Sequence, residues 1–236
     1  MKKKFISFIA LAALAASAAI AAEQPAEKKI IAPAALAAPA AIAAPLAPAQ
    51  KWDVLADKSA IIFHGKQMGA DFEGAINKFT PEIYFDENNL DQSKVTVDID
   101  MNSIDGKDPE RNKSIKGADW FDTERFPTAR FETTKFTKTG DHAFTAEANL
   151  TIHGIAIPVQ LPFKLEYQAV GFGQDRVIMT GSVTLDRSKF QLGQGDWADP
   201  SVIANEVPVD VKVTATAAGA AAPPQAQGSL GKTATP

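Results

Sequence analysis

The segment from residue 157 to residue 167 alternates without interruption between apolar and polar side chains. The apolar positions are Ile157, Val159, Leu161, Phe163, Leu165 and Tyr167, and the positions between them are Pro158, Gln160, Pro162, Lys164 and Glu166. Because successive side chains of a strand point to opposite faces, this pattern predicts a long β-strand with one apolar face. Either a packed core or a bound apolar ligand must cover that face.

The same alternation recurs along the chain. It is found in segments 72–76, 83–85, 95–101, 144–152, 177–185 and 207–213, and apolar runs near Ile61 and Phe131 resemble it. Together these segments predict about eight strands, mostly joined by short turns, which is typical of an antiparallel barrel or sandwich. An eight-stranded barrel is just wide enough for a filled core or one small ligand. Segment 105–122 is polar and contains Pro109, so we expect a loop with a short helix there, whose Trp120 and Phe121 close one barrel end.

Both ends of the chain differ in composition from its middle. A cleaved signal peptide is predicted over 1–22, with an uncleaved anchor as the alternative. The pattern consists of three lysines, an apolar run over 5–22 and small residues at the end of that run. Residues 23–50 are rich in Ala and Pro and predict an extended linker, and residues 218–236 predict a disordered tail. The folded domain is therefore expected over 51–217. The chain has no cysteine, so a secreted domain must be held by its own core, and we expect it in the periplasm.

Charge and motifs exclude several functions. The formal net charge is −4, and it becomes −8 for residues 51–217 alone, so nucleic acid is not an expected partner. His64, His142 and His153 lie far apart in sequence, without the short spacing typical of metal ligands. The chain has no Gly-x-Ser-x-Gly elbow and no phosphate-binding or dinucleotide-binding glycine motif. We therefore predict no enzyme, no metal and no covalent cofactor, with a hydrolase based on paired carboxylates as the alternative.

Several motifs, in order along residues 51–217, resemble those of the YceI-like family. They are Trp52-Asp53, Ser59-Ala60-Ile61-Ile62-Phe63, Phe72-Glu73-Gly74, Ala118-Asp119-Trp120-Phe121-Asp122, Phe126-Pro127-Thr128-Ala129-Arg130-Phe131, Leu150-Thr151-Ile152, Pro158-Val159, Asp186-Arg187-Ser188-Lys189-Phe190 and Glu206-Val207. The run Gly195-Asp196-Trp197-Ala198 is most similar to YceI domains fused to diheme b-type cytochromes. The chain departs from the family pattern at Lys58, where many members have His, and at Asn112, where many have Asp.

The resemblance implies an eight-stranded lipocalin-like barrel that holds an isoprenoid lipid, either a polyprenyl phosphate or a quinone. We expect the ligand to contact Phe63, Phe72, Phe85, Ile99, Phe131, Leu150, Leu161 and Phe163, with ordinary core packing as the alternative for each. Arg111, together with Lys113 and Lys116, is expected at the barrel mouth near the head group, and Arg187 is a further candidate there.

The resemblance also implies a periplasmic carrier of that lipid, with a membrane cytochrome or a second copy of the chain as a further partner. Two other functions remain open at this point. One is an accessory protein that hands quinone to a membrane cytochrome, and the other is a structural or stress-response barrel with a filled core.

Overall fold

The computed structural model describes residues 49–169 and 175–219. The predicted signal peptide, the linker up to residue 48 and the tail from residue 220 lie outside these residues, so they stay predictions. Within the described ranges, no helix is both long enough and apolar enough to cross a membrane.

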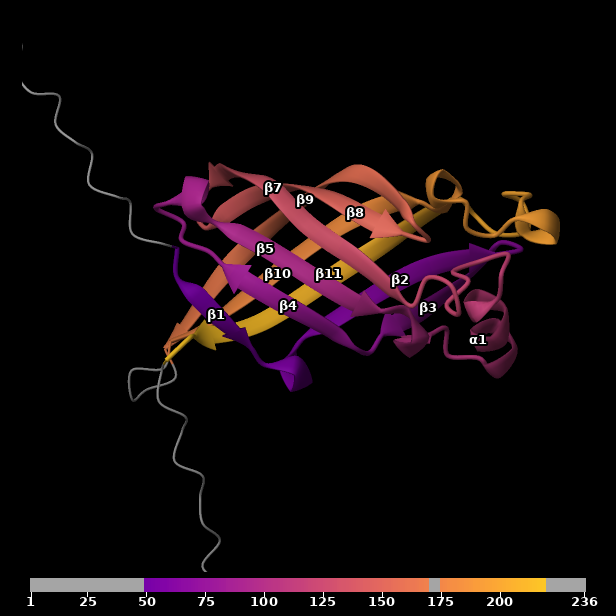
Figure 1. Cartoon of the computed structure of the whole chain (residues 1–236), viewed down its shortest axis with the longest axis horizontal. Coiled ribbons are helices and arrows are strands. Elements are labelled where there is room, and N and C mark those ends of the chain that lie inside the picture. The colour runs from indigo at the N-terminus through magenta and orange to yellow at the C-terminus, as the bar shows by residue number, and fades with distance from the viewer. Residues whose placement is uncertain (1–48, 170–174, 220–236) are drawn as a thin grey trace, which may run out of the picture. The chain divides into compact units, whose positions relative to one another are not determined.

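Eleven strands in the described part of the chain form one antiparallel sheet (Figure 1). The strands are β1 (Lys51–Val54), β2 (Ala60–Gln67), β3 (Ala70–Ile76), β4 (Phe79–Tyr84), β5 (Lys94–Asp100), β6 (Ile104–Asp105), β7 (Thr128–Gly140), β8 (Ala143–Ile152), β9 (Ile155–Ala169), β10 (Asp175–Asp186) and β11 (Glu206–Ala217). Eight of these described strands close a barrel in the order β1-β4-β5-β7-β8-β9-β10-β11, because β1 pairs with both β4 and β11. The predicted all-β, eight-stranded antiparallel barrel with a short helix is confirmed.

The strands that close the barrel differ in one respect from those that the sequence predicts. β1 has only four residues, too few to show a clear alternation, and the sequence analysis does not find it. The predicted strand near Ile61 is β2, which pairs with residues 209–212 of β11. The predicted strand over 72–76 is β3, which pairs with β2 and so extends the sheet. β11 therefore pairs with β2 at one end of the barrel and with β1 at the other.

The strand over 157–167 forms the middle of β9, as its alternation predicts. Leu161 and Phe163 are buried inside the barrel, at 7% and 9% exposure. β9 pairs with β8 over residues 155–164 but with β10 only from Phe163 onward. Pro158 and Pro162, which lack an N–H, lie where β9 pairs with β8 alone. The sheet is thus open between β9 and β10 at the N-terminal end of β9.

Irregular segments fill the places where the strands separate. The short 3₁₀ helices are η1 (Ala56–Lys58), η2 (Leu90–Gln92), η3 (Met101–Ser103), η4 (Arg187–Phe190) and η5 (Gly195–Trp197). Phe190 and Leu192 pack against Leu150 and against the inward side chains of the first half of β9. The segment that contains η4 therefore covers the opening between β9 and β10.

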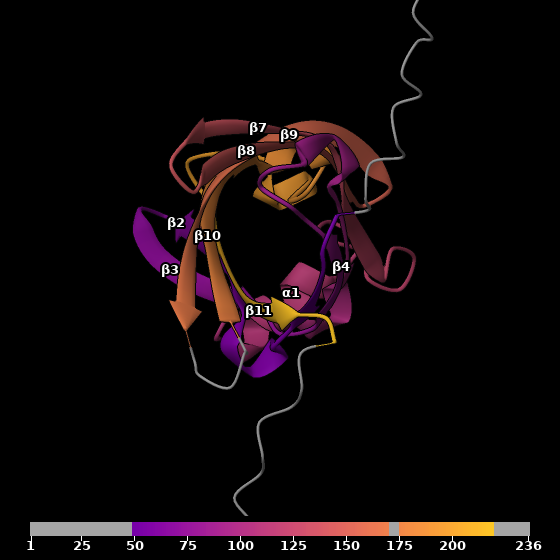
Figure 2. The ribbon, with the colours of Figure 1, turned by 90° about the vertical axis from the view of Figure 1, so that its left-hand side faces the viewer.

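Helix α1 (Pro109–Lys116) lies at one end of the barrel (Figure 1). It begins with Pro109, whose fixed φ suits a first helical turn, and the side chain of Asp108 accepts a hydrogen bond from the N–H of Arg111. We call the end of the barrel at which α1 lies the helix end. Figure 2 views the barrel from its other end, and α1 lies behind the ring of strands. The predicted helical segment over 108–122 therefore contains one helix of two turns.

The opposite end of the barrel is filled with phenyl rings. Phe85, Phe136, Phe144 and Phe163 pack together, with ring centroids 5.2–6.2 Å apart for five of their pairs. All four are buried, and Phe144 is the least exposed at 1%. Trp52 of β1 donates a hydrogen bond from Nε1 to the carbonyl of Phe85. We call this the aromatic end, and we call the four rings the aromatic plug.

Candidate ligand-binding cavity

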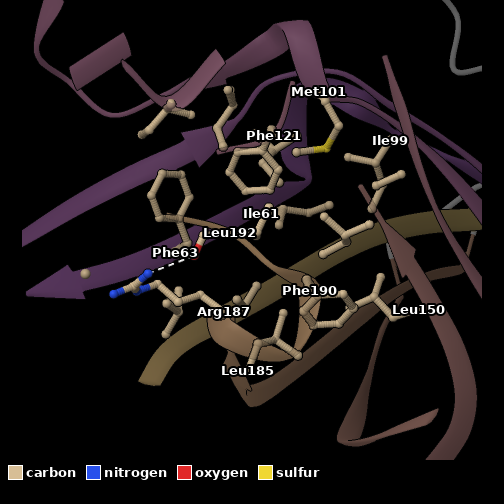
Figure 3. Close-up of a pocket in the computed structure, with 18 of the residues that line it drawn as sticks. Ile61, Phe63, Ile99, Met101, Phe121, Leu150, Leu185, Arg187, Phe190 and Leu192 are labelled. Atoms are coloured by element: carbon tan, nitrogen blue, oxygen red, sulfur yellow. Dashed lines mark hydrogen bonds between the residues drawn. The ribbon is translucent and has the colours of Figure 1, made fainter. Parts of the chain in front are cut away.

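The barrel encloses a cavity of about 380 Å³ that extends from the helix end toward its middle. Its walls are apolar side chains from β2, β3, β4, β5, β7, β8, β9, β10 and β11, together with the segments that cover the helix end. Ile61, Ile99, Met101, Phe121, Leu150, Leu185, Phe190 and Leu192 are among them (Figure 3). The volume lies within the range of pockets that bind small molecules.

The tips of two phenyl rings at the helix end lie over glycines of the neighbouring strand. Phe63 of β2 pairs with Gly74 of β3, and Gly65 pairs with Phe72. A Cβ on Gly74 would stand 2.1 Å from the Phe63 ring, and a Cβ on Gly65 would stand 2.2 Å from the Phe72 ring. Only a residue without Cβ therefore permits these ring positions, which leave the middle of the cavity open.

Arg111 of α1 lines the cavity at the helix end. Its guanidinium carbon lies 4.1 Å from the centre of the Phe72 ring, and its NH1 donates to the carbonyl of Gly106 at 2.6 Å. Its Nε is buried and has no hydrogen-bond partner within the residues that the structure describes. This donor belongs to a side chain that lines the cavity, although the atom itself is closed off from the empty space, and a buried donor left unpaired is costly.

Trp120, in the loop after α1, provides a second donor of this kind. Its ring lines the cavity, and its Nε1 is also buried without an acceptor in the described part of the chain. The ring lies between Trp197, at 6.3 Å between centroids, and the guanidinium of Arg187, at 5.5 Å. Trp120 and Phe121 are predicted from the sequence to close one barrel end, and the structure places both in the cavity wall there.

Arg187 is predicted as a head-group contact, but its guanidinium is bound elsewhere. The side chain is 3% exposed, and its nitrogens donate to five backbone carbonyls at 2.7–3.1 Å. The acceptors are the carbonyls of Leu192, Gly193, Trp197, Ile203 and Ala204. One of these bonds, to Leu192, is drawn in Figure 3. Because a guanidinium has five N–H donors, Arg187 holds the 187–205 segment together and has none left for a head group.

A second, smaller cavity of about 90 Å³ lies deeper in the barrel, toward the aromatic end. Phe85, Phe136 and Phe163 of the aromatic plug line it, together with Trp52 and Tyr167. The two cavities have six lining residues in common, which are Ile83, Val95, Phe131, Leu161, Met179 and Val213. The cavities therefore adjoin, and we call these six residues the waist.

The predicted contact residues divide between the two cavities. Phe63, Phe72, Ile99, Arg111, Phe131, Leu150, Leu161 and Arg187 line the larger cavity, whereas Phe85 and Phe163 line only the smaller one. Lys113 and Lys116, although they lie on α1, line neither, and Lys58 is exposed on η1. The structure adds Met179, Phe190 and Leu192, of which the last two lie in an irregular segment without any periodic signal. That these residues contact a ligand stays a prediction.

Asn112, the position that departs from the family pattern, holds the loop before α1. Its Nδ2 donates to Asp105 at 3.0 Å, and its Oδ1 accepts from the N–H of Gly106 at 2.6 Å. The hydrogen bond from Asn112, followed by that from the N–H of Lys107, lowers the pKa of Asp105 to about 2. Asn112 therefore fixes the loop from which Arg111 projects.

A polar cluster borders the smaller cavity. The hydroxyl of Tyr167 donates to Glu87 at 3.2 Å, and His142 Nδ1 lies 3.2 Å from the other oxygen of the same carboxylate. Burial, followed by the charge of Glu87, raises the pKa of Tyr167 to about 12. Tyr167 is 43% exposed, so the last apolar position of the 157–167 pattern lies at the rim of the aromatic end.

Comparison with known proteins agrees with this architecture. The family model described as the YceI-like domain matches residues 52–215. The chain belongs to the YceI-like family. A Vibrio vulnificus protein of the UPF0312 group is 32% identical over 146 residues, which are 59% of this chain and 75% of that protein. A Vibrio parahaemolyticus protein of the same group is 31% identical over 156 residues, covering 62% of this chain and 80% of that protein.

Solved structures of YceI-like and similar barrels superpose on the chain. The crystal structure of Burkholderia cenocepacia BcnA has a TM-score of 0.64 and 30% identity, covering 69% of this chain and 99% of that one. A polyisoprenoid binding domain from Saccharophagus degradans, implicated in plant cell wall breakdown, has a TM-score of 0.55 and 17% identity, covering 72% and 99%. At that identity the second likeness shows the fold alone.

Proposed function

We propose that this YceI-like protein binds one isoprenoid lipid in the barrel, with an uncharged head group such as a quinone at the helix end and the tail toward the aromatic end. The observation that carries the proposal is the apolar cavity of about 380 Å³. At its helix end it is lined by Arg111 and Trp120, whose Nε and Nε1 are buried and have no partner among the described residues. A purely apolar ligand leaves these donors unpaired, whereas a head group with an acceptor can pair with one of them after a small rotation of its side chain.

The apolar wall supports the tail's position. Burying apolar surface is worth about 25 cal/mol per Å², and an isoprenoid tail has no polar group that a wall of Phe, Leu, Ile and Val would leave unpaired. The Saccharophagus domain with the same fold is described as polyisoprenoid binding, which supports the same ligand class here. A binding function needs no catalytic group, and we propose that the protein is not an enzyme.

The charges at the helix end favour a quinone over a polyprenyl phosphate. Asp108 and Glu110 line the cavity beside Arg111, and the guanidinium of Arg187 is fully used by backbone carbonyls. A phosphate would meet two carboxylates and one partly used arginine, so repulsion would offset its attraction. A quinone carbonyl is a neutral acceptor, so it can lie beside Arg111 or Trp120 without this repulsion.

The place of action is proposed from the sequence. The predicted signal peptide supports a carrier in the periplasm, where a lipid with a long apolar tail needs a protein to cross water. The resemblance of residues 195–198 to cytochrome-fused YceI domains supports a second candidate, an accessory protein that hands quinone to a membrane cytochrome. The carrier alone would bind quinone without changing its reduction rate in membranes, whereas the accessory protein would increase that rate.

Extraction of the purified protein tests the proposal. The full chain, purified from its native host, is extracted with organic solvent and analysed by mass spectrometry, and the emptied protein is titrated with ubiquinone and with polyprenyl phosphate. We expect a stoichiometric isoprenoid quinone and tighter binding of ubiquinone than of the phosphate. If the purified protein carries no lipid and the emptied protein binds neither probe, the proposal is wrong.

A matched pair of variants on α1 tests the head-group site. Arg111→Gln removes the unpaired Nε at the cavity, whereas Lys113→Gln removes an exposed charge of the same helix that lines neither cavity. Loss of one hydrogen bond to a buried partner costs about 1–3 kcal/mol, which corresponds to roughly 5-fold to 150-fold weaker ubiquinone binding for Arg111→Gln. Lys113→Gln should bind as the natural protein does, and equal effects in both variants would remove Arg111 from the site.

A further inference from the structure

The waist between the two cavities is a ring of side chains around the barrel. Its six residues come from six different strands, Ile83 from β4, Val95 from β5, Phe131 from β7, Leu161 from β9, Met179 from β10 and Val213 from β11. A tail that extends from the helix end must pass this ring before it enters the smaller cavity. The waist therefore divides the barrel interior into a first and a second compartment for the tail.

The side chains of the waist differ in how easily they move. Val95 and Val213 are β-branched and have few rotamers, whereas Met179 is unbranched with three rotatable bonds. Met179 is partly buried: it lines both cavities and packs against the core cluster that contains the aromatic plug. Rotation of this one side chain changes the width of the ring without moving a strand.

Beyond the waist, the aromatic plug forms part of the wall of the smaller cavity. Phe85, Phe136 and Phe163 face the smaller cavity, and Phe144 packs behind them at 5.3 Å from Phe85 and 5.5 Å from Phe163. The ring of Phe163 contacts all three other rings of the plug, at 5.5–6.2 Å between centroids. The hydrogen bond from Trp52 to the carbonyl of Phe85 holds the backbone that carries the Phe85 ring. The plug is thus a rigid wall.

We propose that the aromatic plug measures the length of the bound tail. Tail units fill the larger cavity, pass the waist beside Met179 and fill the smaller cavity, and the plug stops any further unit. This inference rests on the proposed function and adds a specificity to it: the barrel prefers isoprenoid tails that end at the plug. Units beyond that length stay outside the barrel, where they gain no apolar burial.

Two substitutions in the smaller cavity move the predicted stop in opposite directions. Phe163→Leu shortens the side chain that faces the cavity and should admit more of the tail. Ala215→Leu adds three carbons at a buried position that lines only the smaller cavity and should admit less. Phe72→Leu, at the helix end of the larger cavity, is the control because it changes the wall but not the distance to the plug.

The experiment measures dissociation constants for ubiquinones whose tails carry two to ten isoprene units. In the natural protein, affinity should rise at least about 10-fold per added unit until the tail reaches the plug, and should then stay constant. The length at which the rise ends should increase in Phe163→Leu, decrease in Ala215→Leu and stay unchanged in Phe72→Leu. A general folding defect cannot shift this length both ways.

Two other results would count against the inference. If all variants bind ubiquinones with the same limiting length, the plug does not measure the tail, although the proposed function stands. If no ubiquinone of any length binds the natural protein, the proposed function and this inference both fail.

Discussion

At the aromatic end of the barrel the strands pair all the way round, whereas at the helix end they separate and irregular segments complete the wall. The aromatic end is held by contacts between apolar rings from β7, β8, β9 and the residue after β4. The helix end is held by hydrogen bonds from polar side chains to the backbone, above all those of Arg187 and Asn112. The proposed site lies where regular pairing stops, because there Arg111 and Trp120 bring side chains with N–H groups into the cavity wall.

The largest effect on stability is expected when the aromatic plug is opened. Phe144→Ala removes a ring that is 1% exposed and contacts two other rings, so unfolding free energy should fall by about 3–5 kcal/mol. Phe63→Ala, at the helix end, removes a ring that is only partly buried beside the cavity and should cost less. Urea unfolding of both variants measures the difference, and an equal loss would mean that the two ends are packed alike.

Removing Arg187 should give the next largest effect, at the helix end. In Arg187→Gln, most of the five backbone carbonyls lose their buried donor, so the free energy of unfolding should fall by roughly 3 kcal/mol. Arg111→Gln breaks one such bond and should cost about 1 kcal/mol, while it weakens ubiquinone binding. If Arg187→Gln is as stable as the natural protein, then its hydrogen bonds do not hold the helix end together.

A glycine substitution tests whether the position of the Phe63 ring over Gly74 keeps the cavity open. In Gly74→Ala the new Cβ would meet the Phe63 ring and, at 2.8 Å, the carbonyl of Asp105, so the ring must turn into the cavity. We expect a loss of about 1–3 kcal/mol in stability and weaker ubiquinone binding. Gly140→Ala is the matched control, since its Cβ would lie at an ordinary 3.5 Å from Ala143. Unchanged binding by a folded Gly74→Ala protein would contradict this reading of the cavity.

The smallest effect concerns the pH response of the aromatic end. The pKa of Tyr167 is raised from 10.0 to about 12, so the folded state favours the protonated phenol. That contribution is complete below pH 10 and is lost as the pH rises through about 12. Tyr167→Phe should therefore lose less stability than the natural protein over this range, as measured by urea unfolding at each pH. Parallel curves for the two proteins would show that the phenol is not coupled to folding.

The amount that could be predicted from the sequence differs between the two ends. Alternation identifies β9 and places Leu161 and Phe163 inside, because the period of a strand is independent of its neighbours. It does not identify β1, which has four residues and depends on pairing with β4 and β11. Nor can it show that Arg187 is saturated by carbonyls from residues 192–204, because that depends on the path of an irregular loop.

The sequence places Arg111 near the barrel mouth, but it does not show which of its N–H groups are paired. The sequence places Arg111, Lys113 and Lys116 together on one polar segment, whereas the structure turns only Arg111 toward the cavity. The unpaired Nε of Arg111 follows from its position over Phe72 and its bond to Gly106, and both are long-range or loop contacts without a local signal.

The orientation of the ligand is the central claim, and tryptophan fluorescence tests it most directly. Trp52 lines the smaller cavity at the aromatic end, and Trp120 lines the larger one at the helix end. One variant keeps only Trp52 and the other keeps only Trp120, and each is saturated with ubiquinone, whose head group quenches a nearby indole. We predict strong quenching of Trp120 and weak quenching of Trp52. Quenching of Trp52 that equals or exceeds that of Trp120 would contradict the account.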